Sequence, residues 1–307
     1  MRLAETGAAV NHTDGGVNNA VRLLRHTLLE LPIRTVRAHH GGWACQVLEI
    51  NRRWIFRFAR MLANARDTER ALRFYPLLQR VVSVPIPSTR WVSRTPKGRI
   101  RFVGYPKLPG REMPSTGLGG DRGQRWARSL AGMLRALDCV PTHKAINVGI
   151  PLMAPREEQE YRWRRYRSIA RIVGSRISRG DLRRDHESNT VALEDPHFFR
   201  VRPTLGHGDL FPYHILVGPG RLGITGVIDW EDASIQDPAV SLAGLPLEGG
   251  FARRVLEFWR PGDEALWYRS RVRGHWAVGN DVIHWYRLKD GVRLSQALRN
   301  YVATIPE

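Results

Sequence analysis

Chemically active side chains cluster in residues 207–230, which read HGDLFPYHILVGPGRLGITGVIDW. Asp209 and His214 stand five residues apart, and Asp229 lies further along the same stretch. A carboxylate can accept the proton of a hydroxyl group, and carboxylate oxygens and imidazole nitrogens can bind a metal ion. A base beside a metal site is the layout that phosphoryl transfer requires. These three residues are therefore the candidate active site.

The spacing of these residues depends on a predicted β-hairpin. Two apolar, β-branched runs, 215–217 and 224–228, flank the Gly-Pro-Gly segment 218–220, which is typical of two strands joined by a short connection. Pairing the strands brings the residue before the first beside the residue after the second, so we expect His214 and Asp229 to meet at one end of the hairpin. Asp209 would lie on the preceding loop. His207 is expected to bond the loop backbone and to have a structural role.

The hydrophobic pattern predicts the elements that must position this hairpin. Three predicted strands, 34–38, 44–50 and 54–58, form a small antiparallel sheet. Two further strands are predicted at 90–92 and 100–103. A connector rich in glycine and proline follows at 104–110. The predicted helices are 64–82, 122–137, 157–178 and 251–304. Pro76 would kink or divide the first of these helices.

Composition limits the class of protein without deciding its function. A chain of 307 residues, of which 42% are hydrophobic, can bury a sizeable core. No apolar run approaches the roughly 18 residues that a membrane-spanning helix needs. The N-terminus lacks the basic-then-apolar order of a secretory signal, and two cysteines are too few for a disulfide framework. We therefore expect a soluble, cytoplasmic protein.

The formal net charge of +19 suggests a nucleic-acid partner, but its distribution does not single one out. Nearly all of the excess is arginine spread along the chain. Nine arginines fall in residues 161–184, where the apolar residues have helical spacing. Two interpretations stay open for this segment: a solvated basic face of an amphipathic helix, or a patch for nucleic acid or an anionic ligand.

The motif and the order of elements resemble the aminoglycoside phosphotransferase and choline kinase family, whose members have a protein-kinase-like fold. Residues 226–233 (GVIDWEDA) and 236–238 (QDP) are similar to the metal-binding Asp motif and trailing Asp-Pro of that family. The HGDLxPxH pattern of residues 207–214 resembles the macrolide phosphotransferases in particular. The resemblance implies a bilobal α+β fold. An N-terminal nucleotide-binding lobe with a small antiparallel sheet would span 1–104, a hinge 105–110, and a mainly helical C-terminal lobe with the catalytic hairpin 111–307.

The resemblance further implies transfer of the γ-phosphoryl group of ATP or GTP to a hydroxyl of a small molecule. Asp209 would be the catalytic base or orient the hydroxyl. His214 and Asp229 would hold Mg²⁺, or Mn²⁺, because imidazole suits transition metals better than magnesium. The histidine stands where protein kinases have an asparagine. His207 and Asp237 would be structural.

The nucleotide contacts implied by the resemblance lie mostly in the N-terminal region. Arg57 would pair with the phosphates, in a place where many members of the family have lysine, and Glu69 on the following helix would hold Arg57 by an ion pair. The alternative for Arg57 is an ordinary strand-end cation. The remaining contacts would be a turn over the phosphates at Gly41 and Gly42 and purine hydrogen bonds from the backbone of Tyr105 and Lys107.

Two departures from the family pattern bear on activity. Ser241 stands where an aspartate commonly braces the site, and Asp138 replaces a common histidine after Leu137. The acceptor could be an antibiotic such as a macrolide or an aminoglycoside, or a sugar or other metabolite. The region from residue 251 onward is aromatic and net basic, which favours a neutral or anionic acceptor over a polycation if these aromatics line the acceptor site; the alternative is that most of them pack the helices of the core.

Two other classes of function stay open. A degenerate kinase fold could act as a nucleotide sensor or as a basic binding module. A metallohydrolase would instead use a metal cluster of His207, Asp209, His214 and Asp229, and the sequence offers no further ligand pair for it.

Overall fold

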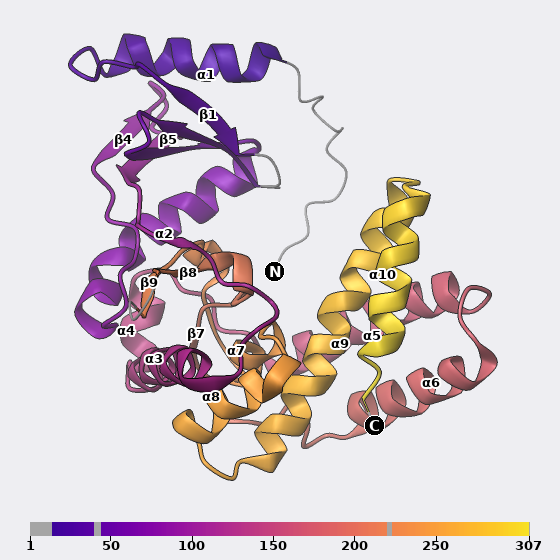
Figure 1. Cartoon of the computed structure of the whole chain (residues 1–307). Helices are drawn as coiled ribbons and strands as arrows, with labels where there is room; N and C mark the ends of the chain where they lie inside the picture. The colour runs from indigo at the N-terminus through magenta and orange to yellow at the C-terminus, as the bar shows by residue number, and fades with distance from the viewer. Residues whose placement is uncertain (1–13, 40–43, 220–222, 307) are drawn as a thin grey trace.

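Five antiparallel strands in the order β1-β2-β3-β5-β4 form the N-terminal sheet (Figure 1). The computed structural model describes residues 14–39, 44–219 and 223–306. The strands are β1 (Val36–His39), β2 (Cys45–Ile50), β3 (Trp54–Ala59), β4 (Trp91–Arg94) and β5 (Ile100–Pro106). They follow the predicted positions, except that β5 continues into the expected connector, where Gly104 is the register partner of Phe56 on β3. The division of the chain at 104 and 110 stays a prediction.

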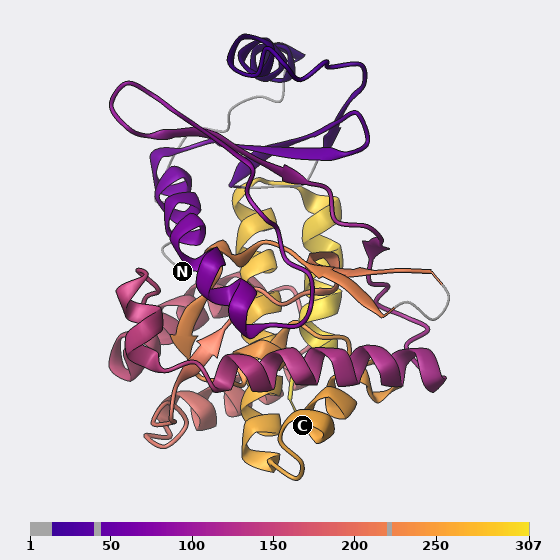
Figure 2. The ribbon, with the colours of Figure 1, turned by 90° about the vertical axis from the view of Figure 1, so that its left-hand side faces the viewer.

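Two helices flank this sheet on different sides (Figures 1 and 2). Helix α1 (Asp14–Thr27) is an element that was not predicted, and it buries Ala20 and Leu24 against the apolar side chains of the sheet, among them Leu48. Helix α2 (Leu62–Val81) contains Pro76 without being divided by it. The buried Phe74 of α2 belongs to the core of the helical region, so α2 links the sheet to the rest of the molecule.

The helical region holds two small sheets. One pairs β7 (Thr204–Gly206) with β10 (Ser234–Gln236), and the other has the order β6 (Arg111–Glu112), β8 (Ile215–Val217), β9 (Ile224–Val227). The helices around them are α3 (Gly120–Asp138), α4 (Thr142–Asn147), α5 (Pro155–Val173), α6 (Arg179–Glu194), α7 (Val240–Ala243), α8 (Phe251–Trp259), α9 (Glu264–Arg287) and α10 (Gly291–Ala303). Within the described ranges, no helix has both the length and the apolar composition to cross a membrane.

Two predicted helices were too long, and polar caps start new helices directly after the first and inside the second. The one predicted for 157–178 ends at Val173, and the Ser178 hydroxyl accepts a hydrogen bond from the Asp181 amide at the start of α6. The stretch 251–304 is three helices. Asp263 and Asp290 cap α9 and α10 by accepting hydrogen bonds from backbone amides.

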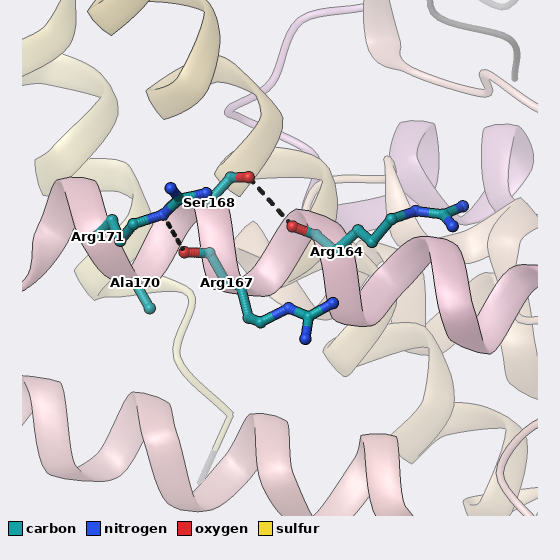
Figure 3. A pocket seen from close by; sticks show the side chains of 5 residues that line it. All are labelled: Arg164, Arg167, Ser168, Ala170 and Arg171. Carbon is teal, nitrogen blue, oxygen red and sulfur yellow. Dashed lines mark hydrogen bonds between the residues drawn. The ribbon is translucent and has the colours of Figure 1, made fainter.

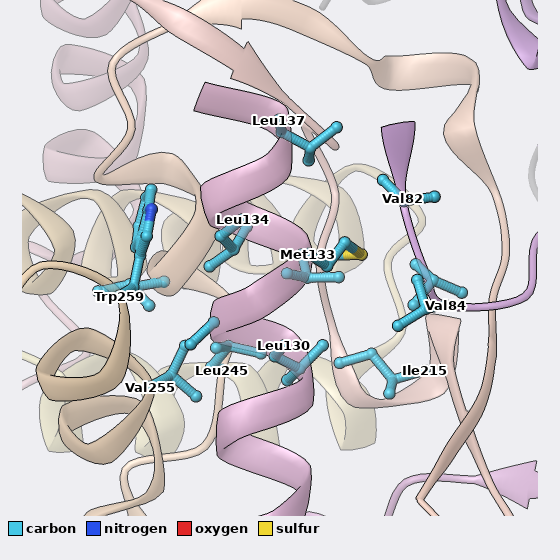
Figure 4. Packing of buried hydrophobic residues seen from close by; sticks show 14 of the residues in the cluster. Val82, Val84, Leu130, Met133, Leu134, Leu137, Ile215, Leu245, Val255 and Trp259 are labelled. Atoms are coloured by element: carbon cyan, nitrogen blue, oxygen red, sulfur yellow. The ribbon is translucent and has the colours of Figure 1, made fainter. Parts of the chain in front are cut away.

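The largest core cluster fixes the hairpin in place. Leu130, Met133 and Leu134 of α3 point into it and meet Val255 of α8 and Ile215 of β8 (Figure 4). Ile215 is fully buried, as is its register partner Val227 on β9. Burial of such side chains is worth about 1.5–3 kcal/mol each. The residues that flank the hairpin are therefore held by the core directly beneath them.

Candidate active site

His207 is a buried scaffold for the loop between β7 and β8. A backbone carbonyl can only accept, so the contact of His207 Nε2 with the Ile228 carbonyl, 2.9 Å away, assigns the ring proton to Nε2. The Asp209 amide then donates to Nδ1 at 3.2 Å. Burial and the nearby His214 lower the pKa of His207 to about 4. A neutral ring bonded at both nitrogens to the backbone supports the expected structural role.

Gly208 lets this loop pass close to the segment after Asp229. Its φ is +86°, and a Cβ at this position would lie 2.0 Å from the carbonyl oxygen of Asp232. Backbone strain of a non-glycine residue at such a φ costs about 1–3 kcal/mol. We expect Gly208→Ala to destabilise the protein by more than this, because the new Cβ also clashes with the Asp232 carbonyl. Urea denaturation would measure this, with the equivalent change at Gly132, where nothing lies within 4 Å, as the control. Equal stability of the two variants would contradict the expectation.

Asp209 follows on the loop with one third of its side chain exposed. Burial raises its pKa to about 6, and the charges of Asp232, Asp229 and Asp281 add to this rise, while the charge of His214 opposes it. Asp209 Oδ2 lies 3.5 Å from His214 Nδ1. The carboxylate is thus partly accessible and has a raised proton affinity, as a group that must accept a proton near neutral pH requires.

His214 and Asp229 meet at the end of the β8–β9 hairpin, as the spacing predicted. His214 Nδ1 donates to the Asp209 carbonyl at 2.8 Å, and His214 Nε2 lies 3.2 Å from Asp229 Oδ2. Burial lowers the pKa of His214, but the hydrogen bond and charge of Asp229 outweigh it, so this pKa is raised. Although burial acts to raise the pKa of Asp229, Arg57 and His214 hold it well below its usual value.

This pair fits a divalent cation that takes its other ligands from elsewhere. With Nδ1 donating to a carbonyl, Nε2 of a neutral His214 is a free acceptor facing the acceptor Oδ2 of Asp229. His214 Nε2 and Asp229 Oδ2, which lie 3.2 Å apart, are the two atoms that would hold such an ion. Mg²⁺ is typically held by one or two side chains plus phosphates and water.

The same geometry counts against the metallohydrolase alternative. Among the residues that the structure describes, no group of three or more His, Cys, Asp or Glu side chains is arranged to hold a metal ion. A catalytic zinc site needs three protein ligands. The His207 ring nitrogens are both engaged with the backbone, which removes one of the four proposed ligands.

Arg57 reaches the site from β3, and its partners differ from the predicted ion pair with Glu69. Its Nη2 donates to Asp229 Oδ1 at 2.9 Å, and its Nη1 lies 2.6 Å from Glu231 Oε1. Glu69 instead pairs with Arg94 of β4, at 2.6 and 3.0 Å. Glu69 therefore does not hold Arg57. Glu231 was missed as its partner, although it stands two residues after Asp229 in the motif.

The other predicted nucleotide contacts are partly engaged within the fold. The Lys107 amide donates to the Arg53 carbonyl at 2.8 Å, so this N–H is not free for a purine. Its ammonium group donates to Glu49 at 3.0 Å. Tyr105 is buried in β5 opposite Ile55. Gly41 and Gly42 lie outside the described residues. A purine-binding role for this part of the chain stays a prediction.

Asp237 lies in a buried ion network that joins α9 and α5. Its Oδ2 accepts hydrogen bonds from Arg269 Nε at 2.9 Å and from Arg273 Nε at 3.1 Å. Arg273 also binds Glu158 of α5. Asp237 Oδ1 accepts the Ala239 amide at 2.9 Å. These contacts support a structural role, directed at the helices behind the site.

The two family departures have different structural settings. Asp138 at the end of α3 accepts hydrogen bonds from Trp259 Nε1 at 2.8 Å and from Arg260 Nη2 at 2.8 Å, so it joins α3 to the end of α8. Ser241 is buried in α7, and its hydroxyl oxygen would lie 3.4 Å from a Cβ built at Gly206.

The arginine-rich segment, residues 161–184, runs from α5 into the start of α6, and its arginines on α5 lie in two environments. Arg162 packs inside and pairs with Glu158, whereas Arg164, Arg167 and Arg171 are exposed along one side of the helix (Figure 3). In the described part of the chain, none of these three has an acidic partner. They line a surface hollow of about 540 Å³ that contains none of the predicted site residues. Both interpretations of this segment stay open.

Comparison with known proteins identifies the relatives of this architecture. The GDP and kanamycin complex of APH(2")-IIia has a TM-score of 0.81 at 22% identity, covering 93% of this chain and 98% of that one. Macrolide 2'-phosphotransferase type I has a TM-score of 0.69 at 19% identity, covering 94% and 97%. The apoenzyme of macrolide 2'-phosphotransferase MphH from Brachybacterium faecium gives 0.63 at 22%, covering 96% and 99%. At these identities the likeness confirms the predicted kinase-like α+β fold.

Similarity in sequence decides the family. No curated protein matches this chain. The profile of the phosphotransferase enzyme family matches residues 35–275, which is well over half of the chain and includes Arg57, Asp209, His214 and Asp229. This confirms the resemblance noted in the sequence, and the chain belongs to the phosphotransferase enzyme family.

Proposed function

We propose that the protein is a cytoplasmic kinase that transfers the γ-phosphoryl group of ATP or GTP to a hydroxyl of a small molecule. The observation that carries this proposal is the meeting of Asp209, His214 and Asp229 at one end of the hairpin, with Arg57 reaching them from the sheet. These are the parts that phosphoryl transfer uses: a base, metal ligands and a cation for the phosphates.

Each side chain has one task in this proposal. Asp209 orients the acceptor hydroxyl and accepts its proton, and Arg57 offsets negative charge on the nucleotide phosphates. His214 and Asp229 would hold a divalent cation, which supplies charge neutralisation between the phosphates when it is bound. Catalysis would then come mainly from positioning and from charge stabilisation.

Local charge favours an acceptor that carries positive charge. The charges that raise the pKa of Asp209 belong to three acids, Asp232, Asp229 and the exposed Asp281 on α9. Tyr213 is about half exposed, and partial burial and the charges of Asp209 and these three acids raise its pKa. This negative neighbourhood points away from the neutral or anionic acceptor that overall composition favours. Cationic amino sugars are the class that it suits.

A phosphorylation screen would test the proposed function. The protein would be incubated with ATP or GTP, Mg²⁺ or Mn²⁺, and acceptors in three charge classes: aminoglycosides and macrolides, neutral sugars, and anionic hydroxylated metabolites. Product mass and nucleoside diphosphate release would be measured. Phosphorylation of a cationic acceptor supports the proposal in full. Stabilisation by a triphosphate without turnover of any acceptor would favour the sensor, and stabilisation by nucleic acid alone would favour the basic module.

The pH profile of turnover should follow the raised pKa of Asp209. The base is active only when ionised, so kcat/KM is expected to fall as pH decreases through about 6. An aspartate with its ordinary pKa of about 3.9 would keep its activity well below that. Because the charge of Asp281 contributes to the rise, Asp281→Asn should move the acid limb to lower pH. A profile that stays flat down to pH 4.5 would contradict this assignment.

A further inference from the structure

Arg57 is held by carboxylates of the segment after β9. Its side chain is only 8% exposed, so its charge needs partners inside the protein. Each partner binds a different nitrogen: Nη2 goes to Asp229 and Nη1 to Glu231. The two contacts are therefore separable.

Helix α2 contributes to this arrangement indirectly. Its Glu69 is engaged by Arg94, and its Asp67 lies 3.0 Å from Arg70 Nη1. Arg70 Nη2 donates to the backbone carbonyl of Glu231. The helix thus braces the backbone that carries Glu231, while the carboxylate of Glu231 reaches Arg57.

The separate contacts give the two carboxylates different tasks. Asp229 also faces His214, so its charge is shared between Arg57 and the proposed metal pair. Glu231 has no such second cation among the side chains of the described residues, and only 13% of its side chain is exposed. A guanidinium with two donor ends can keep Nη1 on Glu231 when Nη2 leaves Asp229, which a lysine ammonium cannot do in the same geometry.

We propose that Glu231 is the positioning residue that holds Arg57 for the nucleotide phosphates, the role predicted for Glu69. The inference rests on the proposed function, because it takes the phosphates as the ligand of Arg57. The segment after β9 would then supply two carboxylates. Asp229 would bind the metal ion, and Glu231 would hold Arg57 of β3.

Glu231→Gln tests the proposal, because it keeps the volume of the side chain and replaces the carboxylate that binds Arg57 Nη1. We expect the KM for the triphosphate to rise about 10- to 100-fold, the range typical of partners that orient a binding group. In an Arg57→Met background the same change should cost nothing further, since Glu231 acts through Arg57. Thermal unfolding of the four variants without nucleotide should also show non-additive effects.

Glu158→Gln is the matched control. It removes a buried carboxylate from Arg273, which lies in a different part of the fold. Its midpoint of thermal unfolding should fall while the KM for nucleotide is unchanged. A merely structural role for Glu231 would give the same pattern as this control.

The outcomes separate the inference from the proposed function. If the wild type phosphorylates an acceptor and Glu231→Gln keeps its nucleotide KM, the inference alone is overturned. Additive effects of the Arg57 and Glu231 changes, or a rise in KM in Glu69→Gln instead, would overturn it as well. If the wild type neither binds nor uses a triphosphate, both the proposed function and the inference fail.

Discussion

Replacing Asp209 with asparagine should abolish phosphoryl transfer while leaving nucleotide binding largely intact. The substitution keeps the shape of the side chain and removes the carboxylate that accepts the hydroxyl proton. Loss of a general base typically lowers kcat by about 10²- to 10⁴-fold. The loop itself should keep its structure, because the amide and carbonyl of residue 209, not its side chain, make the close bonds to His207 and His214.

Steady-state kinetics and calorimetric titration with ATP and GTP would measure the two effects of Asp209→Asn separately. The thermal unfolding midpoint serves as the control for folding. Unchanged turnover in this variant would remove Asp209 from the mechanism. A loss of nucleotide affinity as large as the loss of kcat would place Asp209 in binding rather than in proton transfer.

Asp237→Ala should cause the largest loss of stability among the changes considered. Asp237 is almost completely buried, and its removal leaves Arg269 without a described carboxylate partner and Arg273 with only Glu158. Breaking a buried ion pair by removing one partner typically costs about 3–5 kcal/mol, because a charge is left uncompensated. The hydrogen bond to the Ala239 amide is lost as well.

Urea denaturation would measure this loss, with Glu160→Gln as the control. Glu160 pairs with Arg156 on the exposed side of α5, 3.2 Å away, and helix pairs of this kind contribute about 0.3–0.5 kcal/mol. If Asp237→Ala costs no more than the control, the network around Arg273 does not stabilise the fold in the way that its burial indicates.

The parts of the site that sequence predicted correctly are those built from local contacts. His214 and Asp229 stand immediately before and after two strands joined by a short connection, so pairing of those strands must bring them together. The expected contact of His207 with the loop backbone is equally local. Patterns of glycine, proline and β-branched residues encode such short-range geometry.

The partner of Arg57 could not be predicted in this way. From the sequence, either Glu69 or Glu231 could form an ion pair with Arg57. Which of them does so depends on the rotation of α2 relative to the sheet. In the structure, Arg94 of β4 takes Glu69, and Arg57 is left to Asp229 and Glu231. Helix register against a sheet is set by side-chain packing across many residues, which a single sequence does not display.

By itself, the sequence determined the kinase-like family, the α+β order of elements and the residues of the hairpin site, because motif spacing and strand pairing act over short distances. Only the tertiary structure decided that α1 covers the sheet, that Asp237 serves the helices behind the site, and that Asp281 brings negative charge to Asp209. These contacts join residues far apart in the chain, and burial determines which charges are paired.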